Sequence, residues 1–187
     1  SIFGAAGNAG LAREEIKDKI IKKLKDLLLP TIVSGTKGDL SDKNDYINVT
    51  FSEGVWGAGA LPLEEIDFSL ICSGCKEDGN ASAVDIISVK KKPVLQADVD
   101  NPADLTGGEI EIRVFLDITG IPSGAETISI EPSDGGSIYD KTINAMAPGQ
   151  NNGAIPLYDK LSPTITFTYV ADKNEYISVT FSEAVWK

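Results

Sequence analysis

The stretch Asp42-Lys-Asn-Asp-Tyr-Ile-Asn-Val-Thr-Phe-Ser-Glu-Gly-Val-Trp56 decides the fold, because it occurs again as Asp172-Lys-Asn-Glu-Tyr-Ile-Ser-Val-Thr-Phe-Ser-Glu-Ala-Val-Trp186. Only three of the 15 positions differ, namely Asp45/Glu175, Asn48/Ser178 and Gly54/Ala184. Within each copy Ile, Val and Phe alternate with polar residues, which is the period of a half-buried β-strand. A repeat this dense indicates a chain built from repeated structural units.

A second, fainter similarity relates Ser1–Ala9 to Ser137–Ala145, which share Ser, Ile, Asn and Ala. The two similarities follow the same order along the chain at nearly the same separation. They predict four parts: residues 1–10 as the tail segment of a preceding repeat, 11–29 as a helical linker, 30–160 as one complete repeat, and 162–187 as the first strands of a following repeat.

Strand patterns dominate the complete repeat. Residues 109–117 alternate, with Ile110, Ile112, Val114 and Leu116 predicted to face inward. Further strands are predicted at 66–72, 83–89, 127–130, 154–157 and 164–170, between clusters of Gly, Pro, Asn and Asp. About seven short strands without interleaved helices indicate a mainly β fold, an antiparallel β-sandwich of immunoglobulin-like type.

One segment departs from this pattern. Residues 11–29 carry Ile16, Ile20, Leu24, Leu27 and Leu28 at helical spacing, and Pro30 follows. This predicts one N-terminal amphipathic α-helix that packs on a sandwich or spaces two domains. Membrane-surface binding is the alternative, but acidic residues balance much of its positive charge.

Composition narrows the function. The chain has no histidine, which removes the Ser/His and Cys/His pairs and the commonest proton shuttle, so we expect no enzyme. The formal net charge of −11 repels phosphate backbones, so nucleic acid is not an expected partner. No apolar stretch approaches the ~20 residues of a transmembrane helix.

Several motifs resemble the bacterial immunoglobulin-like repeats that occur in tandem in large secreted and cell-surface proteins, such as the cyanobacterial swimming-protein repeat. They are residues 49–55, 121–130, 137–140 and 144–146. The resemblance implies an extracellular or cell-surface location and an adhesive, spacer or fibre-forming role. Residues 140–144 replace the small, Gly-containing turn of the family, whereas residues 4–8 keep it.

Two acidic loops offer oxygen ligands for Ca²⁺, the only cofactor that the sequence suggests. The first contains Asp98, Asp100, Asn101 and Asp104, with Glu109 just beyond; the second contains Asp39, Asp42 and Asp45. The spacing in the first loop is not that of an EF-hand, and a solvated acidic loop is the alternative interpretation there.

Cys72 and Cys75 lie at the end of a predicted strand, which predicts a local disulfide or two reduced thiols in a turn. With no histidine and no other cysteine, a zinc site would lack ligands. Trp56 and Trp186 are predicted to pack in a core or between domains, and carbohydrate stacking is the alternative.

The sequence thus predicts an extracellular structural module: a stalk, an adhesin repeat or a filament subunit joined by strand exchange. The strands after residue 162 would form the interface, through Ile165, Phe167, Ile177, Val179, Phe181 and Trp186. Expected partners are copies of the chain or adjacent repeats. Because residues 57–136 have no counterpart in the partial repeats, residues 162–187 and 1–10 cannot rebuild a whole sandwich. The alternative is a calcium- or carbohydrate-binding accessory module of a larger secreted protein, with surface glycans as partners.

Overall fold

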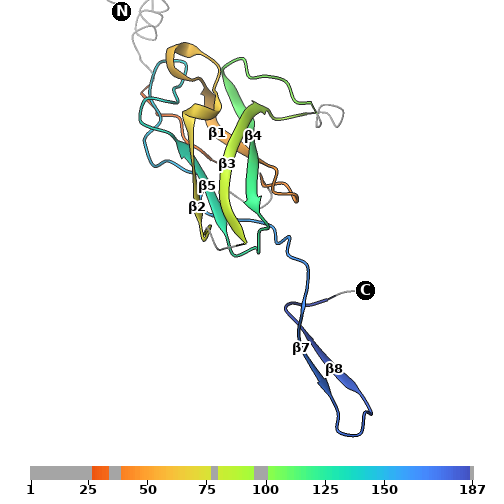
Figure 1. Ribbon diagram of the computed structural model, residues 1–187. Helices are drawn as coiled ribbons and strands as arrows, with labels where there is room; N and C mark the ends of the chain where they lie inside the picture. The colour runs from red at the N-terminus through yellow and green to blue at the C-terminus, as the bar shows by residue number, and fades with distance from the viewer. Residues whose placement is uncertain (1–26, 34–38, 77–79, 95–100, 186–187) are drawn as a thin grey trace, which may run out of the picture.

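The protein is mainly β and contains three antiparallel sheets in a computed structural model (Figure 1), which describes residues 27–33, 39–76, 80–94 and 101–185. The first sheet has the order β1-β4-β3, the second β2-β5-β6 and the third β7-β8. The strands are β1 (Tyr46–Val55), β2 (Phe68–Ser73), β3 (Ala81–Lys91), β4 (Glu109–Gly120), β5 (Thr127–Pro132), β6 (Ile155–Pro156), β7 (Ile165–Val170) and β8 (Ile177–Phe181). Two short 3₁₀ turns, η2 (Ala58–Ala60) and η3 (Glu65–Asp67), precede β2.

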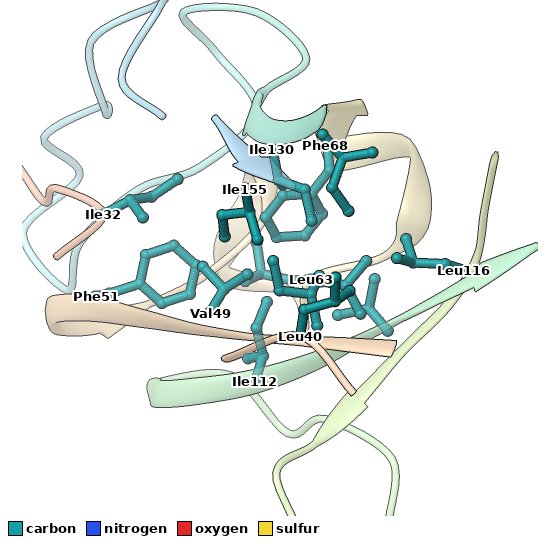
Figure 2. Packing of buried hydrophobic residues seen from close by; sticks show 14 of the residues in the cluster. Ile32, Leu40, Val49, Phe51, Leu63, Phe68, Ile112, Leu116, Ile130 and Ile155 are labelled. Atoms are coloured by element: carbon teal, nitrogen blue, oxygen red, sulfur yellow. The ribbon is translucent and has the colours of Figure 1, made fainter. Parts of the chain in front are cut away.

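The first two sheets share one hydrophobic core and together form the two-sheet domain, residues 27–161. Figure 2 shows Val49 and Ile112 of the first sheet close to Ile130 and Ile155 of the second. Their side chains are buried because alternate residues of each strand point to the same face. Burial of such aliphatic side chains is the main favourable term in folding.

The segment before β1 closes the edge of the first sheet. Ile32 bridges to Phe51 and Leu40 bridges to Ile47, both in antiparallel fashion. All four side chains are buried in the core. Residues 30–33 and 39–56 therefore belong to an irregular hairpin whose second strand is β1.

Strands lie in each of the predicted regions, but one predicted inward residue is exposed. Ile110 is open to solvent, whereas Ile112, Val114 and Leu116 are buried as expected. The β1–β4 register shifts between Thr50 and Val55, so the start of β4 lies outside the regular pairing. The predicted helix 11–29 lies outside the described residues except for Leu27, Leu28 and Leu29, which are not helical.

The third sheet is a hairpin, β7–β8, that projects from the two-sheet domain (Figure 1). Residues 157–161 connect it to the domain, where Lys160 donates its backbone N–H to the carbonyl of Pro122 at 2.8 Å. Every described residue from 161 to 185 is exposed except Ala171. In this part of the chain the structure places no other strand against the hairpin.

Candidate functional site

The hairpin β7–β8 repeats the pairing that residues 30–33 and 39–56 show in the first hairpin. Ile165 pairs with Phe181 as Ile32 pairs with Phe51, and Val170 pairs with Ile177 as Leu40 pairs with Ile47. The repeated sequence therefore folds into the same local structure in both places.

The hydrogen bonds of the two hairpins repeat as well. Ser52 donates its N–H to Thr31 at 2.9 Å, and Ser182 donates to Thr164 at 2.8 Å. In return, the backbone N–H of each threonine donates to the serine hydroxyl at 3.0 Å. These matched bonds fix the register of the two hairpins independently of their surroundings.

The turns also match. Asn44 and Asn174 adopt φ values of 62° and 58° in the left-handed region, which asparagine tolerates better than most residues. The two turns are closed by bonds from Ser41 to Tyr46 at 2.9 Å and from Ala171 to Tyr176 at 3.1 Å. Ala171 therefore occupies the position of Ser41.

The surroundings of the two copies differ sharply. Val49 is completely buried, but its counterpart Val179 is 42% exposed; Phe51 is 1% exposed and Phe181 is 40% exposed. The predicted interface residues Ile165, Phe167 and Ile177 are exposed too, and Trp186 lies outside the described residues. Ile177, Val179 and Phe181 share one face of β8, whereas Phe167 pairs with Thr180 and lies on the other face. Exposed apolar side chains gathered on one face are typical of an interaction site.

An aromatic groove is the second candidate site. It has a volume of about 570 Å³ and is lined by Trp56, Gly57, Gly59, Ala60, Tyr139, Asp140, Lys141 and Ile143. Trp56 and Tyr139 exchange two backbone hydrogen bonds of 2.8 Å, so the two aromatic residues are held side by side. A groove with aromatic walls and a few polar groups is a common form of ligand site.

Glycines make room for the indole of Trp56. A Cβ on Gly107 would lie 2.5 Å from its Cδ1, and a Cβ on Gly108 would lie 2.6 Å from its Cζ2. Both glycines also have positive φ values, of 89° and 84°. The turn before β4 is therefore shaped to hold the tryptophan ring.

The buried carboxylate of Asp140 holds one wall of the groove. Its Oδ1 accepts backbone N–H groups from Thr142 and Asn144, both at 2.8 Å. Burial disfavours the charged form, but these bonds and those from the two side chains outweigh burial and lower the pKa of Asp140. The turn presents Ile143, which is 78% exposed at a φ of 66°.

The structure assigns other roles to two of the predicted calcium ligands. Asp104 is exposed and pairs with Lys90 at 2.5 Å, a contact that lowers the pKa of Asp104. Glu109 accepts hydrogen bonds from the backbone of Thr106 at 2.8 Å and of Gly107 at 2.9 Å. Burial opposes its ionisation, but these bonds prevail and lower its pKa. Both carboxylates therefore support the turn before β4.

Those of the other predicted ligands that the structure describes do not form one cluster. Asp98 and Asp100 lie outside the described residues, and Asn101 is exposed. Asp42 is exposed, and Asp45 accepts a hydrogen bond from the hydroxyl of Ser41; Asp39 lies just before the bridge at Leu40. Among the described residues, no three His, Cys, Asp or Glu side chains form a group that could hold a metal ion. Calcium binding stays a prediction.

Cys72 and Cys75 form a disulfide, with 5.7 Å between their Cα atoms. The bond closes the turn after β2, and both residues pack against the core. It agrees with one of the two predicted states of these cysteines.

Sequence reasoning identified the hairpin and Trp56 but not the rest of the groove. Tyr139, Asp140 and Ile143 lie more than 80 residues from Trp56 in the chain, and no local pattern relates them to it. Arg113 was also missed: it lies on the polar face of β4 but is only 6% exposed, with its guanidinium 3.6 Å from the ring centroid of Tyr46.

Comparisons with family models, curated proteins and solved structures give no match to this chain. In the described part of the chain, no helix is both long enough and apolar enough to cross a membrane. The fold and site geometry therefore carry the functional argument.

Proposed function

We propose that this chain is a non-catalytic structural module of a secreted or cell-surface protein built from tandem immunoglobulin-like β-sandwich repeats. Two antiparallel sheets around one core support the sandwich assignment. The absence of histidine and the acidic charge agree with a structural role outside the cell. The resemblance to bacterial immunoglobulin-like repeats points the same way.

One observation carries this proposal: the second hairpin is built like the first but its apolar face is uncovered. The first hairpin owes its burial to β4 and the second sheet. The second has the same apolar residues at the same positions, and they are exposed. A hairpin alone is marginally stable in water, so β7–β8 gains stability when another unit covers it. Its role in the proposal is to join this unit to a neighbouring repeat or to another copy, as in a stalk, an adhesin or a filament.

Light scattering coupled to size exclusion, over a range of protein concentrations, tests whether the hairpin is an interaction surface. We expect association through the exposed apolar side chains of the hairpins, without exchange of β4 between copies, and we expect it to weaken in the Ile177→Asn/Phe181→Asn variant. The matched control is Val94→Asn, because Val94 is also exposed but lies in the two-sheet domain. A chain that stays monomeric at all concentrations in electron microscopy and light scattering, with and without calcium, would contradict assembly through the hairpin.

The aromatic groove favours a second candidate function, a carbohydrate-binding accessory module. The rings of Trp56 and Tyr139 provide amphipathic surfaces, and Lys141 supplies a donor at the rim. Fluorescence titration with oligosaccharides tests this function, with Trp56→Phe as the variant that should weaken binding.

A raised melting temperature in millimolar calcium would support metal binding, because a ligand that binds only the folded state stabilises it.

A further inference from the structure

The pairing of β1 in the first hairpin indicates which kind of strand would fit the edge of β8 in the second hairpin. One edge of β1 is bridged by Ile32 and Leu40. Its other edge pairs antiparallel with β4, with Ile47 opposite Val114 and Val49 opposite Ile112. The corresponding edge of β8 carries no strand among the described residues. Since β8 repeats β1 in sequence and local geometry, a strand with the apolar alternation of β4 fits this edge.

Of the three positions at which the 15-residue repeats differ, two contact β4 or the turn before it, and the third contributes to a bond within the turn of the hairpin. Asn48 accepts a hydrogen bond of 3.1 Å from Nε of Arg113. This bond compensates a buried charge whose Nη1 atom already has no partner. Ser178 stands in place of Asn48, and its shorter side chain does not reproduce the amide acceptor.

The second difference concerns space. A Cβ on Gly54 would lie 2.7 Å from the carbonyl oxygen of Gly108, closer than real Cβ contacts. Ala184 carries such a Cβ. In the place of β1 it would therefore force the backbone of the glycine turn to move.

The third difference removes a turn contact. Asp45 accepts a hydrogen bond from the hydroxyl of Ser41 through its carboxylate, and its own backbone N–H donates a second bond of 3.0 Å to Oγ of Ser41. In the second copy, Glu175 replaces Asp45 and Ala171 replaces Ser41. At positions 178 and 184, the second hairpin therefore lacks the residues that fit β4 and the glycine turn of this domain.

We propose that the free edge of β8 docks an antiparallel strand of the β4 type from another repeat unit, and that Ser178 and Ala184 select against β4 of a second copy of this chain. This inference rests on the proposed function. The docked strand carries a small uncharged residue where β4 has Arg113, and its flanking turn leaves room for the methyl group of Ala184. Selectivity of this kind combines a retained attractive surface with a misfit toward the wrong partner.

Two peptides with acetylated and amidated ends test, on the full chain, whether the edge of β8 binds a strand of the β4 type. One has the sequence of residues 109–120, and the other has the same sequence with Arg113→Thr. We expect the Arg113→Thr peptide to slow hydrogen exchange at β8 amides and to bind about fivefold more tightly than the unchanged peptide, because an unpaired buried donor is costly. A scrambled peptide is the control. Absence of protection at β8, or equal affinity of the two peptides, would overturn the inference.

A refolding experiment tests whether Ser178 and Ala184 disfavour docking of β8 on β4 of a second copy. The variant Glu175→Asp/Ser178→Asn/Ala184→Gly restores the residues of β1 in an exposed hairpin, so the two-sheet domain should fold normally. After refolding at high concentration, we expect several-fold more exchanged dimer than in the unchanged chain, with β8 amides protected in the dimer. Equal amounts of exchanged dimer in both proteins would overturn the selection by Ser178 and Ala184.

These outcomes are separable from those of the proposed function. The light-scattering experiment tests the proposed function, because it shows whether copies of the chain associate. Peptide protection of β8 concerns which strand its edge accepts, and it is measured on the monomer as well.

Discussion

Ile47 and Ile177 occupy the same position in two copies of one hairpin, but Ile47 is completely buried and Ile177 is 66% exposed. Ile47 on β1 and Ile177 on β8 have the same local sequence and equivalent cross-strand partners, Leu40 and Val170. The difference comes from β4 and the second sheet, which cover only the first copy. Burial here is a property of the neighbours of the hairpin and not of its own sequence.

This contrast predicts unequal effects of the same substitution. Ile47→Ala should lower the free energy of unfolding of the two-sheet domain by about 2–5 kcal/mol, because it leaves a cavity in the core. Ile177→Ala should change it by less than about 0.5 kcal/mol, as is usual at an exposed position. Urea unfolding monitored by circular dichroism measures both. Equal losses for the two variants would contradict the burial difference.

The strands were predictable because their alternation is local. β1, β4 and β8 each have apolar residues at every second position. Because β8 repeats the sequence of β1, the same pattern is found twice. The start of β2 was not predictable in this way. The sequence pattern placed it at Ile66, but residues 65–67 form η3 and β2 begins at Phe68. There Asp67 accepts the N–H of Glu64 at 2.9 Å in a capping box, which holds the chain in a turn.

The candidate site was predictable only in part, because it depends on contacts between distant residues. The hairpin surface follows from the repeat. The groove depends on the approach of Tyr139 to Trp56 and on the turn around Asp140, which no sequence period reports. Composition alone also does not show that Asp104 pairs with Lys90 or that Glu109 accepts backbone hydrogen bonds from Thr106, and calcium binding by the acidic loops stays a prediction.

Backbone strain at Ile143 predicts a stabilising substitution. A β-branched residue at a φ of 66° is disfavoured, and its side chain is exposed, so little packing compensates for the strain. Ile143→Asn should stabilise the protein by about 1 kcal/mol and raise the melting temperature by about 2–4 °C. Ile143→Val is the control, because it keeps the branched side chain and the strain. An unchanged melting temperature in Ile143→Asn would show that the turn is relaxed.

Stability should fall in acid because hydrogen bonds lower the pKa values of Glu126 and Asp140. Both carboxylates are buried; Glu126 accepts the N–H of Ser123 at 2.9 Å, and such bonds outweigh the burial that opposes its charge. The ordinary pKa is 4.5 for Glu126 and 3.8 for Asp140, and both are lower in the folded protein. Each carboxylate therefore contributes its full stabilisation above its ordinary pKa, and this stabilisation is lost as the pH falls through the lower pKa of the folded state.

Asp67 acts in the opposite direction, because burial raises its pKa, so the loss in acid is the net effect of several groups. Urea unfolding between about pH 6 and pH 3 measures it. Asp140→Asn should lower stability at neutral pH and flatten the acid dependence. A variant with the same acid dependence as the unchanged protein would contradict the role of this carboxylate.

The packing of Trp56 on the glycine turn predicts a spectroscopic change. Gly107→Ala would place a methyl group 2.5 Å from Cδ1 of the indole, so the ring must move outward. In a Trp186→Phe background Trp56 is the sole tryptophan, and its emission should shift to the red as it gains contact with water. The matched control is Gly149→Ala, because Gly149 has a similar φ of 77° but nothing within 4 Å of the added Cβ.

Both alanine variants carry the left-handed backbone penalty, which costs about 1 kcal/mol. Only Gly107→Ala adds the steric conflict, so it should lose about 1–3 kcal/mol more and should alone shift the emission. Binding of any ligand in the aromatic groove should weaken in the same variant, since the displaced ring changes its wall. Equal stability losses and an unshifted emission in both variants would show that the turn does not hold the tryptophan.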